Sequence, residues 1–303
     1  QSIEEKKYLR LSFLENSLKE KEHNLVGELT NQHEILKRLT GINSINTNDS
    51  TPINAHIDAP YNSNNSSRRK ALLIGNQAYP SAPLSNPDKD AQDMANALKD
   101  IGFSTVLVTD ATKSSMEIAI NKYIDSIKSG DISYFYYSGH GMQRNGQNHM
   151  IPVDFSGNNS IGINLILEAI SKKGPTASVI TIDACRSFNK GDNGGLASLE
   201  AGSSATYISL AAKPGQTASD GKPNTNGVYT GSILKHIKEP IDIDAIFRKV
   251  TNEVTTVTNN KQEPWVNHSL RAPLILAAPE YKPNKHLTNT LQSPQAQTKI
   301  RRI

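Results

Sequence analysis

Two short segments of the sequence each end near a side chain suited to nucleophilic catalysis. The first is Tyr-Tyr-Ser-Gly-His-Gly at residues 136–141, and the second is Thr-Ile-Asp-Ala-Cys-Arg at residues 181–186. A cysteine at its ordinary pKa of about 8.5 is mostly a thiol at neutral pH, and a neighbouring imidazole can take its proton. His140 and Cys185 together therefore indicate attack of a thiolate on a carbonyl carbon. The glycines beside His140 permit close approach of the backbone.

Acyl transfer also needs donors for the negative charge that develops on the carbonyl oxygen. We predict that the backbone N–H groups of Gly141 and Cys185 supply this oxyanion hole. The alternative is a buried, inert cysteine and an unrelated histidine, which is the better reading of a lone Cys-His pair. Both residues directly follow apolar segments that read as strands, and this paired placement favours catalysis.

Alternating strand and helix patterns between residues 70 and 279 must position these two residues. Apolar runs predict strands at residues 71–75, 105–108, 132–137, 178–183, 206–211 and 273–277. Helical spacing is found at residues 88–101, 114–127, 163–171, 229–237 and 243–257. This alternation is typical of an α/β fold with a mostly parallel, six-stranded sheet and helices on both faces. Ligands of such folds bind beyond the carboxyl ends of the strands, where both candidate residues fall.

The flanking parts of the chain have a different character. Residues 1–40 predict a helical arm, because leucines recur every seven residues over most of residues 3–40. That pattern fits a coiled-coil seam with a helical partner, docking of residues 3–40 on the main domain, or a plain amphipathic helix. Residues 41–69 read as a linker rich in Asn and Ser, and residues 280–303 as a basic, disordered tail.

Composition narrows the class of protein. The chain has 303 residues and one cysteine, which excludes an internal disulfide and an all-cysteine metal site. No apolar run approaches the roughly 18 residues of a membrane-spanning helix, so we expect a soluble protein. The formal net charge of +4 resides in the tail, and we expect no nucleic-acid partner. Because the chain begins with Gln1, it reads as a processed product that could have lost a targeting segment, and a cytoplasmic location is expected.

The segments around His140 and Cys185 resemble those of the caspase-like cysteine peptidases, most closely the metacaspase, paracaspase and bacterial orthocaspase branch. Further matching segments are Ala71–Asn76, Leu84–Asp90, Pro214–Asp220 and Pro264–Trp265. The resemblance spans roughly residues 70–277 and implies a caspase-like fold and an endopeptidase that acts on protein substrates. Metacaspases usually carry His after the cysteine, whereas this chain has Arg186 and resembles paracaspases there.

The resemblance also places Asp90 and Asp183 in the pocket for the P1 residue, which precedes the scissile bond. Asp220 aligns with a third acidic residue of this pocket in paracaspases. Converging carboxylates bind guanidinium or ammonium groups by charge-assisted hydrogen bonds, so we expect cleavage after Arg or Lys rather than after Asp. Each acid has a structural alternative. Asp90 can favour its helix N-terminus, Asp183 can orient a loop and Asp220 can lie at the surface.

No cofactor and no metal ligands are predicted, but some relatives need calcium. Asp88, Asp90 and Asp93 do not have the spacing of an EF-hand loop, so calcium dependence stays open. Trp265 is either a core aromatic or a wall of the substrate groove.

Self-cleavage is a further expectation, because relatives are often cut in the loop after the cysteine. Lys190 is the candidate in that loop, and Arg68 and Arg69 are candidates at the end of the linker, where a cut would release the arm. The alternative to a peptidase is a non-catalytic caspase-like scaffold that acts through its helical arm. The intact histidine and cysteine argue against it.

Overall fold

The computed structural model describes residues 57–58, 68–186, 196–202, 205–213 and 216–277. For Ile57, Asp58, Cys185 and Arg186 the backbone alone is described. The predicted arm at residues 1–40, most of the linker, Lys190 and the tail at residues 280–303 lie outside the described residues.

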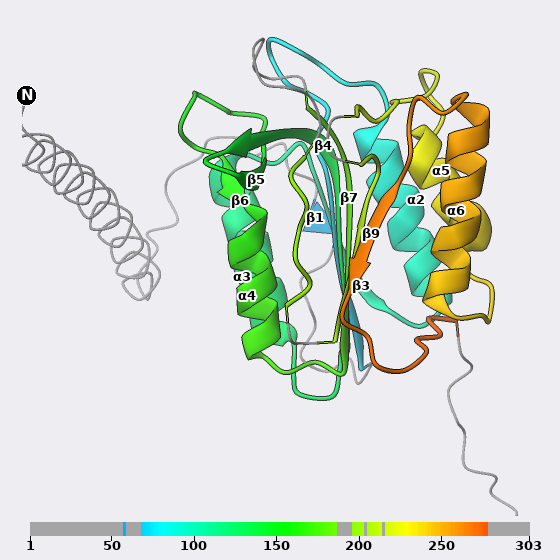
Figure 1. Ribbon diagram of the computed structural model, residues 1–303. Coiled ribbons are helices and arrows are strands. Elements are labelled where there is room, and N and C mark those ends of the chain that lie inside the picture. The colour runs from blue at the N-terminus through cyan, green and yellow to red at the C-terminus, as the bar shows by residue number, and fades with distance from the viewer. Residues whose placement is uncertain (1–56, 59–67, 187–195, 203–204, 214–215, 278–303) are drawn as a thin grey trace, which may run out of the picture. The chain divides into compact units, whose positions relative to one another are not determined.

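A sheet of nine strands forms the centre of the fold (Figure 1). Its parallel strands are, in spatial order, β3 (Ser104–Thr109), β2 (Arg69–Gly75), β4 (Ile132–Arg144), β7 (Ala177–Arg186) and β8 (Thr206–Leu210). The antiparallel strands are β1 (Ile57–Asp58) beside β3, β9 (Trp265–His268) beside β8, and β5 (Gln147–Met150) and β6 (Ile161–Gly162), which extend from β4. The mixed, mostly parallel α/β sheet is therefore confirmed.

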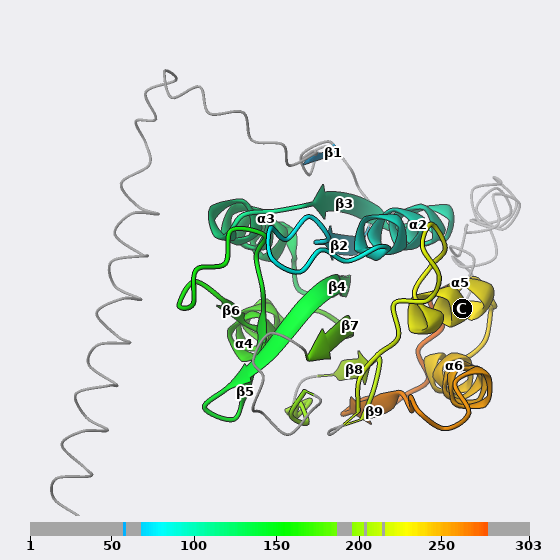
Figure 2. The ribbon, with the colours of Figure 1, turned by 90° about the horizontal axis from the view of Figure 1, so that it is seen from above.

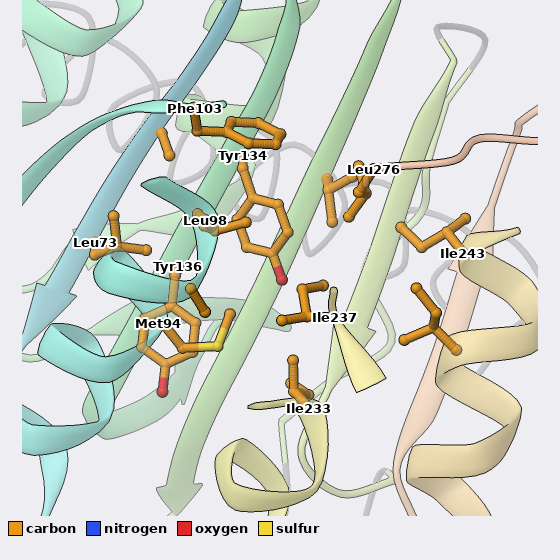
Figure 3. Close-up of a cluster of buried hydrophobic side chains, with 14 of the residues drawn as sticks. Leu73, Met94, Leu98, Phe103, Tyr134, Tyr136, Ile233, Ile237, Ile243 and Leu276 are labelled. Carbon is orange, nitrogen blue, oxygen red and sulfur yellow. The ribbon is translucent and has the colours of Figure 1, made fainter. Parts of the chain in front are cut away.

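Helices cover both faces of this sheet (Figures 1 and 2). One face carries α2 (Pro87–Asp100), α5 (Val228–His236) and α6 (Ile243–Val257), and the other carries α3 (Lys113–Ser126) and α4 (Ile163–Lys172). Side chains of β4 alternate between the two layers, since Tyr134 and Tyr136 pack with the first set of helices and Phe135 and Tyr137 with the second. Figure 3 shows the first layer, in which Tyr134 and Tyr136 lie among residues of α2 and α5. Burial on both faces explains why the strand sequences are apolar without alternation.

The sheet differs from the sequence prediction at its edge. Residues 273–277 were expected as the last strand, but they form only an isolated bridge between Ile275 and Asp242. The edge strand is instead β9, antiparallel to β8. Leu274 and Leu276 are buried in the layer of α5 and α6, which accounts for the apolar pattern without a strand. The three other short strands, β1, β5 and β6, raise the total from the six predicted to nine.

None of the helices in the described part of the chain is long and apolar enough to cross a bilayer.

Candidate active site

The register of β4 and β7 makes the two candidate catalytic residues direct neighbours. His140 lies opposite Cys185, and Ser138 lies opposite Asp183 two residues earlier. Neighbouring strands are about 4.8 Å apart, so the two backbones meet at the carboxyl end of the sheet. Both strands also run further than predicted, because β4 continues past Tyr137 to Arg144 and β7 continues past Asp183 to Arg186.

The imidazole of His140 is oriented by a backbone carbonyl. Its Nε2 lies 2.7 Å from the carbonyl oxygen of Ala82. A carbonyl oxygen only accepts, so Nε2 carries the proton, and the lone pair of the neutral ring is on Nδ1. Burial lowers the pKa of His140, while this hydrogen bond and the charge of Asp220 oppose the shift. The ring therefore favours the neutral form that can accept a proton at Nδ1.

The loop that carries Ala82 is anchored at its beginning. The Oδ1 atom of Asp110 accepts hydrogen bonds from the N–H groups of Gln77 at 2.9 Å and Ala78 at 2.7 Å. The amide side chain of Asn76 accepts from Ala111 N–H at 2.9 Å and donates to the carbonyl of Ile151 at 3.2 Å. These contacts fix the course of the loop toward His140.

Two tyrosine hydroxyls hold the peptide groups of His140. The N–H of His140 donates to the hydroxyl of Tyr79 at 3.0 Å, and the hydroxyl of Tyr137 donates to the carbonyl of His140 at 2.6 Å. Tyr79 donates in turn to the carbonyl of Ile151 at 3.0 Å, and its ring lies 4.4 Å from that of His140. The strand segment that carries the histidine is thus fixed from both sides.

Gly139 is required beside these hydroxyls. Its φ is +154°, and a Cβ atom there would lie 2.7 Å from the hydroxyl oxygen of Tyr137 and 2.8 Å from that of Tyr79. Gly139→Ala is therefore expected to lower the free energy of unfolding by about 1–3 kcal/mol more than Gly146→Ala. Gly146 is the matched control, because its φ is +76° and a Cβ atom there meets nothing within 4 Å. Denaturant unfolding of both variants measures the difference, and equal losses would mean that the hydroxyls move aside freely.

Gly141, the predicted oxyanion donor, is buried next to the histidine. A Cβ atom at this position would lie 3.1 Å from Cβ of Ala184 and 3.3 Å from Cδ2 of Leu196. A larger residue would therefore crowd the region between β4 and the segment after β7. The roles of the N–H groups of Gly141 and Cys185 stay predictions.

The structure brings two of the three predicted acids together, at a place just before His140 and Cys185 on the sheet. Asp90 lies in the first turn of α2 and is 1% exposed, and Asp183 lies in β7 and is 8% exposed. The Oδ2 atoms of both lie within 3.2 Å of the point where a Cβ atom of Gly227 would be. The helix position proposed as the structural alternative for Asp90 is real, but its carboxylate faces Asp183 across this space.

Neutral donors surround both carboxylates. Asp90 Oδ1 accepts from Gly227 N–H at 3.0 Å and from the side-chain amide of Asn226 at 3.1 Å. The hydroxyl of Thr230 donates to Asp183 Oδ2 at 2.6 Å. In the described part of the chain, neither carboxylate forms an ion pair with Lys, Arg or His.

This environment raises the pKa of both acids. Burial, followed by the charge of Asp90, raises the pKa of Asp183 to about 8. Burial also raises the pKa of Asp90 to about 6, although the hydrogen bonds from Asn226 and Gly227 oppose the shift. A cation between the two carboxylates would oppose both shifts, because it favours the charged forms.

Asp220 lies near these acids without bonding to them. Its Oδ2 accepts from Ser85 N–H at 3.3 Å, and its backbone carbonyl accepts from the side chain of Asn86. Its charge contributes to the raised pKa values of both Asp90 and Asp183. Asp220 therefore acts on the pair through its charge and is tied to the loop that leads from Ala82 to α2.

Four residues that contribute to the site were not predicted from the sequence. Asn226, Gly227 and Thr230 lie more than 130 positions from Asp90 or more than 40 from Asp183, and only the packing of α5 brings them close. Ala82 contributes a main-chain oxygen, which no residue type reveals.

Arg68 and Arg69, the cleavage candidates at the end of the linker, lie where the chain enters the sheet, and cleavage there stays a prediction. The carbonyl of Arg68, which a peptidase would attack, accepts a hydrogen bond from Ile132 N–H at 2.8 Å. Arg69 is the first residue of β2, pairs with Ile132, and donates from its side chain to the carbonyls of Ile101 at 2.8 Å and Leu276 at 2.6 Å. Cutting either bond would first require the start of β2 to separate from β4.

Trp265 is 40% exposed, so it is not a core aromatic. It begins the edge strand β9 and lies opposite Leu210, the last residue of β8. Its alternative role as a wall of the substrate groove stays a prediction.

The three acids considered for calcium do not form one cluster. Asp90 and Asp93 do share a donor, since the side-chain amide of Asn226 donates to them at 3.1 and 3.0 Å, and Asp93 also pairs with Lys89 at 2.8 Å. Asp88 instead lies against Asp110. Burial and the charge of Asp110 raise the pKa of Asp88 to about 7. Among the residues with described positions, no group of three or more His, Cys, Asp or Glu side chains could hold a metal ion.

Comparisons with known proteins agree with this architecture. Residues 68–275 match the family described as the caspase domain. The chain is 27% identical over 220 residues to the human mucosa-associated lymphoid tissue lymphoma translocation protein 1, covering 69% of this chain and 27% of that protein. It is 31% identical over 128 residues to the mouse homolog, covering 41% of this chain and 15% of that protein. The chain thus spans about a quarter or less of the length of these curated relatives.

The crystal structure of protein GSU0716 from Geobacter sulfurreducens has a similar fold. Its TM-score is 0.52 at 17% identity, covering 67% of this chain and 94% of that one. The family match covers more than half of the chain, and the fold agrees with it. The chain belongs to the caspase-domain family of cysteine peptidases.

Proposed function

We propose that this protein is a cysteine endopeptidase that cleaves protein substrates after arginine or lysine. One observation carries the proposal. Two buried carboxylates, Asp90 and Asp183, converge beside Gly227 close to the paired backbones of His140 and Cys185. Burying two acids side by side is costly unless a cation joins them, and the described residues offer none. A P1 guanidinium or ammonium group is the cation that fits.

The proposed chemistry uses the histidine and the cysteine as a dyad. Nδ1 of His140 takes the thiol proton of Cys185, and the sulfur attacks the scissile carbonyl carbon. The N–H groups of Gly141 and Cys185 stabilise the oxyanion. The imidazolium then gives its proton to the leaving amine as the peptide C–N bond breaks. Water, deprotonated by the same imidazole, hydrolyses the thioester and regenerates the thiol.

The protonation state of His140 supports this order of events. Nε2 is committed as a donor to the Ala82 carbonyl, so proton transfer falls to Nδ1. The same hydrogen bond persists when the ring becomes an imidazolium, because both nitrogens are then donors. The carbonyl thus steadies the ring through both protonation states.

A panel of peptide reporters with Arg, Lys, citrulline or Asp at P1 tests the proposal. We expect cleavage after Arg and Lys, and slower cleavage after the neutral isostere citrulline by about 100-fold, since hydrogen bonds to charged groups contribute about 1.5–3 kcal/mol. Cys185→Ala is expected to lose cleavage of every reporter. Cleavage after Asp, or activity that survives in Cys185→Ala, would refute the proposal.

Self-processing after Lys190 is the remaining part of this proposal. Intact-mass measurement of the wild type beside Cys185→Ala, after equal incubation, reads it directly. A cut at residue 190 in the wild type alone supports it, and an unchanged mass contradicts it.

A further inference from the structure

Gly227 occupies an unusual place between the two buried acids. It is the N-cap residue of α5, with a φ of −51° and a ψ of 150°. Any L-residue can adopt these angles, so the backbone does not demand glycine here. Glycine is a common N-cap residue, and the space around the Cα atom of Gly227 gives a second, independent reason for it.

That space is bounded by three acceptor oxygens. A Cβ atom on Gly227 would lie 3.1 Å from Asp90 Oδ2, 3.2 Å from Asp183 Oδ2 and 3.7 Å from the backbone carbonyl oxygen of Ser219. No other glycine of the described chain has carboxylate oxygens around its Cβ position. The three atoms nearest to this position are thus all acceptor oxygens.

The start of α5 also holds this arrangement in place. Gly227 N–H donates to Asp90 Oδ1 at 3.0 Å, and Thr230, one turn later, donates to Asp183 Oδ2 at 2.6 Å. The hydroxyl of Thr230 is itself bonded to that of Tyr136 at 2.6 Å. One helix end therefore donates to both carboxylates and keeps them next to the Cα atom of Gly227.

We propose that Gly227 sets the depth of the P1 pocket, so that a guanidinium rests against its Cα atom and donates to Asp90, Asp183 and the Ser219 carbonyl together. This inference rests on the proposed function. The guanidinium has five N–H donors in a planar fork, whereas an ammonium has three donors on one atom. Acceptors spread around one point suit the fork better, so arginine should be preferred to lysine.

The test compares Gly227→Ala with Gly231→Ala. A methyl group at residue 227 would lie against the Oδ2 atoms of Asp90 and Asp183, where the guanidinium is proposed to bind. We expect kcat/KM for a P1 arginine reporter to fall by about 30-fold, mainly through KM, since one methyl in a pocket changes selectivity by ~10–200-fold. The loss should be larger for arginine than for lysine. Gly231 is the matched control in the same helix, because its Cβ atom would only meet Asn226 Cβ at an ordinary 3.5 Å.

A second readout does not depend on turnover. In the Cys185→Ala background, binding of a peptide that ends in arginine, measured by calorimetry, should weaken by a similar factor with Gly227→Ala and stay unchanged with Gly231→Ala. Unchanged arginine binding in a folded Gly227→Ala protein overturns the inference. Failure of Gly227→Ala to fold also overturns it, because the glycine would then serve the backbone.

Different results would refute the peptidase function and the role of Gly227. A wild type that cleaves after no basic residue refutes the proposed function. A wild type that cleaves after arginine, with Gly227→Ala as active as the wild type, refutes only the role of Gly227.

Discussion

Asp183→Asn is expected to lower cleavage after arginine strongly and, at the same time, to stabilise the fold. The carboxyl group of Asp183 has a pKa of about 8 in the folded chain, raised by burial and by Asp90, against an ordinary value of 3.8. Folding therefore disfavours its charged form. Asp183 therefore contributes most to the free energy of unfolding at a pH below 3.8. This contribution is lost as the pH rises from there to about 8. Asparagine has no charge to bury and keeps an oxygen for the hydroxyl of Thr230.

The stability gain should thus depend on pH. We expect Asp183→Asn to raise the free energy of unfolding at pH 8 by on the order of 2 kcal/mol, and the melting temperature by roughly 4–8 °C. At pH 4 the two proteins should differ little. Calorimetric melting at both pH values measures this. Asp125→Asn is the control, because Asp125 is exposed and pairs with Lys173 at the surface.

The loss of activity is the counterpart of that gain. Removing one of two carboxylates from the P1 pocket should lower kcat/KM for arginine reporters by about 100-fold or more. A variant that is less stable than the wild type at pH 8 would mean that Asp183 serves the structure. A variant that keeps its arginine activity would mean that the P1 cation lies elsewhere.

Binding of an arginine side chain at pH 7 is expected to release about one proton. With pKa values of about 8 for Asp183 and about 6 for Asp90, the free pocket holds roughly one proton at this pH. A bound guanidinium favours both carboxylates and lowers their pKa values, so the proton must leave. Affinity for arginine should consequently rise as pH increases from 6 to 8, because less protonation has to be reversed.

Calorimetry in two buffers of different ionisation enthalpy counts these protons. The Cys185→Ala background removes both turnover and the thiol as a proton source. A peptide that ends in citrulline is the control, since it has no charge to expel the proton. Arginine binding whose heat is the same in both buffers would contradict the prediction and would indicate that both acids are already ionised in the free protein.

The sequence predicts the sheet and the neighbouring catalytic candidates because those signals are local. Apolar runs define β4 and β7, and parallel pairing then brings their carboxyl ends to one edge, whatever the rest of the chain does. The strand predicted at residues 273–277 is wrong for a related reason. Leu274 and Leu276 are apolar because they are buried, and burial alone does not specify pairing.

The parts of the site that stayed hidden depend on contacts between distant segments. Gly227 and Thr230 reach Asp90 and Asp183 only after α5 packs on the sheet, and neither residue type suggests a pocket by itself. Arg69 reads as the end of a linker, but pairing with β4 makes it the start of the central strand β2. The placement of Asp90 and Asp183 in one pocket came from the family resemblance, because their spacing in the sequence does not indicate that they meet.

The carbonyl that orients His140 has a consequence for how the protein tolerates mutation. Every residue type has the same main-chain oxygen, so no substitution of Ala82 deletes the acceptor itself. An orienting aspartate or asparagine, by contrast, can be lost in a single change. Mutations can instead misplace this oxygen by changing residues that fix the path of the loop, such as Asn76 and Asp110. Substitutions in the loop can therefore weaken the orientation of His140 step by step, but no single side-chain change removes the acceptor.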